Sequence, residues 1–327
     1  MRVLSGIQSS GKLHLGNYLG AMKQHIELQD EHECFFFIAN YHALTTVQDA
    51  PRLRQLTHDV ALDYLALGLD PAKVNLFRQS DVPAVAELTW ILSTVTGKGL
   101  LERATSYKDK IARGVAPSMG LFGYPILMAA DILIYRSDLV PVGKDQLQHI
   151  EMAQDMAGYF NNTFGCEVLR RPEPRLNEAT VVPGTDGQKM SKSYGNTLNL
   201  FDSPATLRKA IMGIKTDSTP LEAPKDPLTC TVFALYRLLA RPDEVEALAS
   251  RYRAGGMGYG QAKQALAEVV ERVLGPARER REALARDPDY VEDILVTSGR
   301  RARETAEDVM ADVRQACGLA VSKDRHC

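Results

Sequence analysis

Glycines and polar side chains that could bind a nucleotide are concentrated near the start of the chain, in SGIQSSGKLHLGN at residues 5–17. This segment lies between an apolar run at residues 2–7 and a helical pattern, so we expect a strand-to-helix turn. Glycine lets backbone approach a ligand, and a helix N-terminus presents unpaired N–H groups that bind phosphate. His14 and Asn17 add polar groups there. On its own, a glycine-rich turn is weak evidence, because many only reverse the chain. The glycine spacing also differs from the G-x-G-x-x-G motif of dinucleotide-binding folds.

A second cluster of polar side chains is KMSKS at residues 189–193, which follows the loop-forming segment PGTDGQ at residues 183–188. Two lysines could neutralise a polyphosphate while two serines hydrogen-bond to it. A solvated basic loop would also fit these five residues. However, the motif starts 175 residues after His14, where the predicted α/β half of the chain closes.

Together the two motifs resemble the signatures of class I aminoacyl-tRNA synthetases, which are H-x-G-H, here in an H-x-G-N form, and KMSKS. Further segments along the whole chain resemble the tryptophanyl-tRNA synthetases. They are GIQ (6–8), HLGNY (14–18), NYHALT (40–45), MAADIL (128–133), VPVGKDQ (140–146), QHIE (148–151) and KTDS (215–218). Two positions depart from the family: Ser9 stands where proline is usual, and Leu4 where a larger residue is common.

Asp131 carries the physical argument for tryptophan. It lies in an apolar helical run at residues 124–135, and a buried carboxylate is costly unless it is paired. An indole N–H can only donate, so one acceptor in an apolar pocket suits an indole ring. An isolated aspartate would more often be ion-paired or at a helix end. The resemblance implies that the tryptophan site consists of Leu4, Gly6, His42, Tyr124, Met128, Asp131, Val140, Val142 and Gln146.

The resemblance also implies the reaction. The tryptophan carboxylate attacks the α-phosphorus of ATP, pyrophosphate leaves, and tRNA(Trp) then takes the acyl group. Such chemistry depends on positioning and charge stabilisation, so we expect no nucleophilic side chain. The implied catalytic residues are His14, Asn17, Lys189 and Lys192. The implied ATP site consists of Gln8, Ser9, Ser10, Gly16, Asn17, Lys110, Gly143, Lys144, Asp145, Val181, Lys189, Met190, Ser191, Lys192 and Ser193.

Two of these expectations concern charge around the phosphates. Lys108 and Lys110 resemble a further segment that contacts the polyphosphate, and a solvated charged helix fits them equally well. Mg²⁺ should accompany ATP, held by phosphates and water, and we expect no metal site formed by protein ligands alone.

The elements that must position these residues alternate between strand and helix in the first half of the chain. We expect strands at residues 2–7, 34–40, 74–79 and 139–142, and helices at 17–32, 51–68, 85–96 and 146–164. Residues 170–187 look irregular. Helical spacing then dominates at 204–214, 228–239, 242–253, 260–286 and 290–317. This pattern predicts an α/β fold, with a Rossmann-like parallel-sheet catalytic domain at residues 1–195. A smaller α-helical anticodon-binding domain follows at 196–327, whose last helix could pack back on the first domain.

Composition limits the partners. The 327 residues are 45% hydrophobic and 24% charged, with a net charge of −2, so no global basic field attracts nucleic acid. No apolar run is long enough to span a membrane, and the N-terminus does not resemble a secretory signal. Five widely separated cysteines indicate reduced thiols in the cytoplasm rather than a disulfide framework. We therefore expect neither a membrane nor DNA as a partner.

The remaining expectations concern the tRNA and a second subunit. Arginines cluster at Arg278, Arg280 and Arg281 and again at Arg300, Arg301 and Arg303, and such clusters suit phosphate contact. For any single arginine, we favour a side chain that is ion-paired on an exposed helix surface. Arg278 and Glu282 have the i, i+4 spacing of such a pair. The family resemblance further implies a homodimer.

The residues leave three alternative functions open. A tyrosyl-tRNA synthetase would share the fold and the chemistry, but it would need a pocket that recognises a hydroxyl group. A metabolic nucleotidyltransferase would not need the helical C-terminal part. A non-translational paralogue with a regulatory or binding role would not need His14, Asn17, Lys189 and Lys192, all of which are present.

Overall fold

A parallel sheet forms the centre of the first half of the chain. The computed structural model describes residues 1–9, 11–104, 114, 117–176 and 181–320. Within these residues the sheet has five strands in the order β3-β2-β1-β4-β5, all parallel. The strands are β1 (Arg2–Ile7), β2 (Glu33–Ile38), β3 (Val74–Arg78), β4 (Leu139–Val142) and β5 (Glu173–Leu176). The predicted α/β class is confirmed.

Both faces of this sheet are covered, which explains the continuous apolar run in β2. Cys34, Phe36 and Ile38 belong to one hydrophobic cluster, whereas Phe35 and Phe37 belong to a second one. Successive side chains of a strand point to opposite faces, so each cluster lies on its own side of the sheet. A parallel strand buried on two faces cannot alternate apolar and polar residues.

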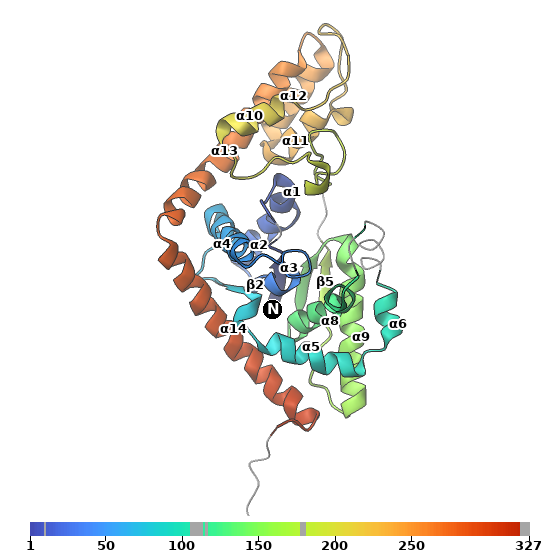
Figure 1. The fold of residues 1–327 in the computed structure, drawn as a ribbon. Coiled ribbons are helices and arrows are strands. Elements are labelled where there is room, and N and C mark those ends of the chain that lie inside the picture. Colours follow the sequence, from blue (N-terminus) through green and yellow to red (C-terminus); the bar gives the residue numbers. More distant parts are fainter. Residues whose placement is uncertain (10, 105–113, 115–116, 177–180, 321–327) are drawn as a thin grey trace, which may run out of the picture.

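The helices of this half cover the sheet on both sides (Figure 1). The longer ones are α4 (Ala50–Leu67), α5 (Ala84–Val95), α8 (Met119–Leu133) and α9 (Leu147–Phe164). The shorter helical segments are α1 (Leu15–Asn17), η1 (Tyr18–Met22), α2 (Lys23–Leu28), α3 (Asn40–Ala43), η2 (Gln79–Asp81), α6 (Lys98–Glu102), η3 (Lys144–Gln146) and η4 (Lys192–Tyr194).

Two of our expectations for this half were wrong. Residues 173–176 form β5 although the region looked irregular, because the segment EPRL has no apolar alternation and contains Pro174. Proline is tolerated in a strand at the edge of a sheet, which is where β5 lies. The first helix is also not continuous, since a π-helical turn at Tyr18–Met22 separates α1 from α2. Such turns often accompany functional sites.

The second half of the chain is helical and extends away from the sheet (Figure 1). Its elements are α10 (Pro204–Met212), η5 (Pro227–Thr229), α11 (Thr231–Leu239), α12 (Pro242–Ala254), α13 (Tyr259–Ala285) and α14 (Pro288–Ala316). Buried residues of α10 to α13 continue the same hydrophobic cluster that contains Val3 and Phe36 of the sheet. The two halves therefore share one continuous apolar core.

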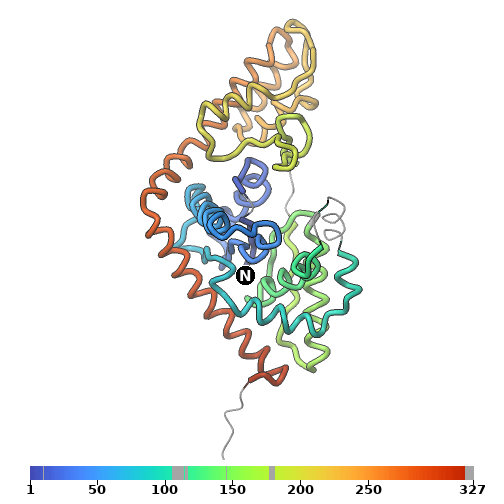
Figure 2. Tube along the Cα trace, in the orientation of Figure 1, coloured from blue at the N-terminus to red at the C-terminus, as the bar shows by residue number. Residues whose placement is uncertain are grey.

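The last helix returns along the catalytic half. Figure 2 shows the chain turning between α13 and α14, and α14 then running down the side of the sheet. It packs against β3 and α5, and Ala302, Ala306 and Met310 are fully buried there. Because β3 is an edge strand, this helix covers an edge that would otherwise expose unpaired backbone groups.

Three of the six clustered arginines contact the catalytic half, which changes their interpretation. Arg281 donates to Asp63 (2.5 Å) and Asp59 (2.9 Å) of α4, and Arg280 donates to the Ala66 carbonyl (2.7 Å). Burial raises the pKa of Asp63 to about 6 even with Arg281 beside it. These hydrogen bonds join α13 to α4. Arg281 is half-buried by them, whereas Arg280 stays exposed.

Arg303 shows the same pattern, whereas Arg278 pairs within its own helix. Arg303 donates to the Asp81 carbonyl (2.6 Å). Arg278 is buried and pairs with Glu271 (3.0 Å), not with Glu282, so the expected exposed pair is wrong. Arg300 and Arg301 are exposed.

No helix within the described ranges combines the length and the apolar character needed to cross a bilayer.

The close contact between α14 and the turn η2 gives a first test. A Cβ added to Gly299 would lie 2.9 Å from the Asp81 Cβ, whereas one added to Gly260 of α13 would meet nothing within 4 Å. We expect Gly299→Ala to lower the free energy of unfolding by about 1–3 kcal/mol because the backbones must separate. Gly260→Ala should leave it unchanged or raise it by up to about 1 kcal/mol. Urea titrations measure both, and equal effects would contradict the close packing.

Candidate active site

A cavity of about 450 Å³ opens at the carboxyl ends of β1 and β4. These two strands pair only at Val3 and Leu139, so their later residues are free to line a space between them. Helices leave β1 toward β2 and β4 toward β5, which makes this the point where the strand order reverses. Ligands of open α/β sheets bind at such a point.

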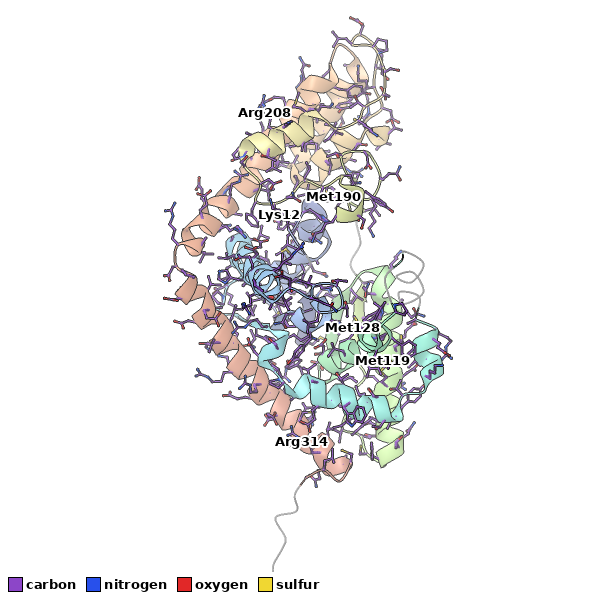
Figure 3. All side chains as sticks on the ribbon, in the orientation of Figure 1. Lys12, Met119, Met128, Met190, Arg208 and Arg314 are labelled. Carbon is purple, nitrogen blue, oxygen red and sulfur yellow. The ribbon has the colours of Figure 1, made fainter. Side chains whose placement is uncertain are left out.

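All nine residues predicted for tryptophan line this cavity. Leu4 and Gly6 come from β1, and Val140 and Val142 from β4. The other five lie on α3, α8 and η3: His42, Tyr124, Met128, Asp131 and Gln146. Gly20 and Ala21 of the π-helical turn also face the cavity, which explains why small residues stand there. The structure thus brings together side chains from five separate segments, and Figure 3 shows Met128 on α8.

Asp131 is buried in the wall of the cavity, with 1% of its surface exposed. Its carboxylate accepts hydrogen bonds from His42 Nε2 (2.9 Å) and from Gln79 Nε2, which is 2.9 Å from both oxygens. Burial raises the pKa of Asp131, and the hydrogen bonds and charge of His42 and the bond from Gln79 act in the opposite direction. A carboxylate has about four acceptor positions, so it can accept one more N–H from the cavity.

Gly6 is required by a close contact on the cavity floor. A Cβ at this position would lie 2.5–2.8 Å from the Phe37 ring. Phe37 itself lines the cavity from β2. Any side chain at position 6 would displace this ring and change the shape of the space.

A second pair of polar side chains lies across the cavity. The Tyr124 hydroxyl and His149 Nε2 are 2.8 Å apart, and burial raises the pKa of Tyr124 to about 12. Both residues line the cavity. Because its pKa is raised, Tyr124 offers the cavity a neutral hydroxyl group at physiological pH.

The predicted nucleotide turn ends at His14, which is buried. Burial, together with the charge of Lys192, lowers the pKa of His14 to about 4. Its Nδ1 is buried and has no hydrogen-bond partner among the described residues. Asn17 Oδ1 accepts from the His14 backbone N–H (3.0 Å), which fixes the start of α1 and leaves the Asn17 amide nitrogen as a donor. The turn therefore offers a neutral imidazole and an amide.

The KMSKS segment packs directly on this turn. Met190 is buried, and a Cβ at Gly16 would lie 3.6 Å from the Met190 Cβ and 3.0 Å from the His14 ring. Lys192 Nζ donates to the Gly11 carbonyl (3.1 Å). Residues 13–15 and 198–200 also pair through two backbone hydrogen bonds, Leu15 to Leu198 (2.8 Å) and Leu200 to Leu13 (3.0 Å). Figure 3 shows Met190 beside Lys12, where the two halves of the chain meet.

Asn196 holds the KMSKS loop in shape. Its Oδ1 accepts from the Ser191 backbone N–H (2.8 Å), and its Nδ2 donates to Asp186 (2.7 Å) and to the Lys189 carbonyl (3.2 Å). The residue is 2% exposed. Lys189, Lys192 and Ser193 are exposed on the loop, so one buried amide presents the two lysines to solvent.

The other residues predicted for ATP have different positions. Gln8 and Gly143 line the cavity, and Gln8 Nε2 donates to the His42 carbonyl (3.3 Å). Lys144 and Val181 are exposed. The Ser9 side chain does not reach the cavity, because it is buried against Thr57 of α4, whose hydroxyl lies 3.4 Å from its own. Ser10, Lys108 and Lys110 lie outside the described residues, and of Asp145 only the backbone is described.

Comparison with known proteins shows the family of this chain. A family model described as tRNA synthetases class I (W and Y) matches residues 1–275. A tryptophan–tRNA ligase of Rhodopirellula baltica is 55% identical over 98% of this chain and 100% of its own length. A tryptophan–tRNA ligase of Fusobacterium nucleatum is 51% identical over 97% of this chain and 98% of its own length. The solved tryptophanyl-tRNA synthetase of Campylobacter jejuni, complexed with ADP and tryptophan, is 49% identical with a TM-score of 0.93, over 98% of this chain and 100% of that one.

The chain belongs to the class I tryptophan–tRNA ligases. The identities above are to ligases named for tryptophan, which favours this assignment over the tyrosyl and paralogue alternatives.

Sequence reasoning about this ligase missed four residues of the site: Gln79, Asn196, Phe37 and His149. Two signals were available. Gln79 directly follows a buried parallel strand, and polar residues at that edge of an α/β sheet point to the site. Asn196 follows the KMSKS motif by three residues. Phe37 is indistinguishable from ordinary core in the sequence. His149 lies in the family-like segment QHIE, but it was not assigned to the site.

The lowered pKa of His14 in this ligase can be tested. Burial is its larger cause and Lys192 the smaller, so we expect Lys192→Ala to raise the pKa of His14 from about 4 but to leave it below 6.5. His25 is the matched control, since burial alone lowers its pKa to about 4. NMR titration of the histidine Cε1–H signals measures both. A His14 pKa that does not move in this variant would show that Lys192 lies too far from His14 to act on it.

Proposed function

We propose that the cavity binds L-tryptophan and that the adjoining surface of His14, Asn17 and the KMSKS loop binds ATP. A tryptophan carboxylate oxygen attacks the α-phosphorus, the bond from that phosphorus to the β-phosphate bridge breaks, and pyrophosphate leaves. A ribose hydroxyl of tRNA(Trp) then attacks the acyl carbon of tryptophanyl-adenylate and releases AMP. The ADP and tryptophan named for the Campylobacter jejuni structure support this pairing of ligands.

The observation that carries the proposal is a single buried carboxylate in the wall of a mostly apolar cavity. Asp131 already accepts from two donors and has acceptor capacity left. An indole ring needs apolar walls and one acceptor for its N–H. Phenylalanine would leave that acceptor facing no donor, and sites built to hydrogen-bond a substrate reject the analogue that lacks the group. Tyrosine would present a hydroxyl on a smaller ring.

The ATP side works by positioning and charge. His14 is neutral at physiological pH because its pKa lies near 4, so it acts as a hydrogen-bonding group and not as a cation. Positive charge for the leaving pyrophosphate comes instead from Lys189 and Lys192 on the loop. Mg²⁺ bound to ATP would supply further charge neutralisation. We propose that it arrives on the phosphates, since Mg²⁺ prefers phosphate oxygens and water as ligands.

The helical half, residues 196–327, is proposed to contact the tRNA. Exposed basic side chains there include Arg208 and Lys209 of α10, and Figure 3 shows Arg208 in the part of this half that holds α10 to α12. Four cysteines within the described ranges are free thiols, which supports the proposal that the protein works in a reducing cytoplasm.

The test of this function is ATP–pyrophosphate exchange with each of the twenty amino acids, with Mg²⁺ and without tRNA. Exchange only with tryptophan is expected. Exchange with tyrosine would keep the chemistry but overturn the pocket assignment. No exchange with any amino acid would contradict activation altogether.

The same assay tests Asp131. Asp131→Ala leaves the indole N–H unpaired, and a buried unpaired donor costs about 1–3 kcal/mol. We expect kcat/KM for tryptophan to fall about 10- to 100-fold, with a small change in the urea midpoint and in KM for ATP. Unchanged kinetics in this variant would remove Asp131 from indole recognition.

A homodimer is a further part of the proposal. The single tryptophan of the chain, Trp90, is 72% exposed on α5, and Met119 at the start of the neighbouring α8 is 82% exposed. Large exposed apolar side chains on adjacent helices often mark interfaces. A second copy of this chain is the occupant that the family resemblance implies.

A pair of substitutions tests the dimer. We expect the unaltered protein to elute as a dimer in size-exclusion chromatography with light scattering, and Trp90→Lys to elute as a monomer because it places a charge in the interface. Leu228→Lys on the helical half is the matched control, since Leu228 is 75% exposed and should not affect the dimer. A dimeric Trp90→Lys would place the interface elsewhere.

A further inference from the structure

Gln79 is a buried polar residue that does not line the cavity and that the reaction scheme leaves without a role. It is 1% exposed and is the first residue of the turn η2, directly after β3. A buried primary amide has two donors and an acceptor to satisfy. The contacts that satisfy them in Gln79 lead to two residues of the tryptophan cavity.

The Gln79 side chain connects α3 to α8. Its Oε1 accepts from the backbone N–H groups of Tyr41 (2.9 Å) and His42 (3.4 Å). With the oxygen held in this way, Nε2 points to Asp131 and lies 2.9 Å from each carboxylate oxygen. The orientation of the amide is therefore fixed at both ends by groups that cannot exchange roles, because backbone N–H only donates and an ionised carboxylate only accepts.

Gln79 consequently contacts both members of the His42–Asp131 pair. It binds the backbone of His42 and the side chain of Asp131, while the His42 ring binds Asp131 directly (2.9 Å). The three contacts form a closed triangle in which the position of the carboxylate depends on the amide. An acceptor held from two directions is preorganised for a third donor.

The turn that carries Gln79 is itself held by neighbouring elements. Ser80 bonds with the Asn40 side chain through its backbone N–H (3.0 Å) and its hydroxyl (2.7 Å). The Asp81 carboxylate accepts from Arg78 (2.9 Å), whose other guanidinium nitrogen reaches Glu292 of α14 (2.8 Å). Gly299 of α14 packs on Asp81. Successive residues of η2 therefore contact the site, α3 and the last helix.

We infer that Gln79 is a positioning residue for tryptophan recognition, which orients Asp131 and holds it ready to accept the indole N–H. The inference rests on the proposed role of Asp131. Gln79 does not touch the substrate in this scheme, and it acts only through the carboxylate.

The decisive variant is Gln79→Glu. Glutamate keeps the size of glutamine and an oxygen for the Tyr41 N–H, but it replaces the donor to Asp131 by a second acceptor. Two carboxylates in one buried site cannot both ionise without repulsion, so they share a proton at low pH and separate as pH rises. The charged and titratable groups around Asp131 are His42 on α3, Tyr135 just after α8, Tyr124 and His149 in the cavity wall, and Asp81 with Arg78 beside the turn.

We expect KM for tryptophan in Gln79→Glu to exceed that of the unaltered protein by about 10- to 100-fold at pH 8.5, since hydrogen bonds to charged groups contribute about 1.5–3 kcal/mol. The ratio of the two KM values should shrink toward pH 6, where the shared proton restores a hydrogen bond to Asp131. KM for ATP should stay within about 2-fold, because its ligands lie elsewhere. Amino-acid-dependent ATP–pyrophosphate exchange from pH 6 to 9 measures all three quantities.

Controls separate positioning from a general loss of structure. Tyr252→Phe removes a buried hydroxyl that contacts Cys230 Sγ (3.4 Å) in the helical half, and both KM values should stay unchanged. An equal loss of activity at all pH values in Gln79→Glu, or a parallel rise of both KM values, would overturn the positioning role. So would kinetics that match the unaltered protein.

Asp131→Ala, measured in the same assay, separates a failure of the role inferred for Gln79 from a failure of the role proposed for Asp131. If it raises KM for tryptophan while Gln79→Glu does not, the inference about Gln79 fails and the function of Asp131 stands. If Asp131→Ala leaves KM unchanged, the indole role of Asp131 fails and the inference fails with it.

Discussion

The constraint that most of the site depends on is the burial of one carboxylate. Removing Asp131 from water is unfavourable unless hydrogen bonds replace its hydration. His42 and Gln79 supply these bonds, and each must be held by its own element. The position of α3, the end of β3 and the turn η2 are therefore all set by one group of α8. The proposed indole recognition depends on this arrangement, because the carboxylate keeps one acceptor position for a ligand.

The nucleotide side depends on a different principle, which is apolar packing between segments far apart in the sequence. Met190 anchors the KMSKS loop against Gly16, and residues 198–200 pair with residues 13–15. The same hydrophobic cluster continues into α10 to α13, and Arg281 joins α13 to α4. Any movement of the helical half relative to the sheet must therefore disturb the loop that carries both lysines. Packed cores resist continuous deformation, so such a movement would have discrete end states.

The sequence predicted the parts of the molecule whose signal is local. The run CFFFIAN indicated a strand buried on two faces, and the turn before His14 indicated the start of a helix. The nine cavity residues came from family resemblance, since Val140 or Met128 alone would read as ordinary core. Gln79 and Asp131 are 52 residues apart, and no spacing rule connects them. β5 was missed because an edge strand needs no apolar alternation. The partners of Arg280 and Arg281 could not be predicted because they lie on α4, far away in the sequence.

In the proposed scheme, selectivity for tryptophan has two sources. The residues that line the cavity supply shape: Gly6 makes room for Phe37, and the branched side chains of β4 form part of the wall. Shape alone discriminates weakly, since one methylene in an apolar pocket is worth only about 1–3 kcal/mol. The larger discrimination must come from the single hydrogen bond to Asp131, and its strength depends on how rigidly the carboxylate is held. Rigidity comes from Gln79 and the turn η2, which α14 supports through Gly299, Arg303 and Glu292. If Asp131 accepts the indole N–H as proposed, a helix at the outer edge of the sheet contributes to amino-acid choice although none of its residues lines the cavity.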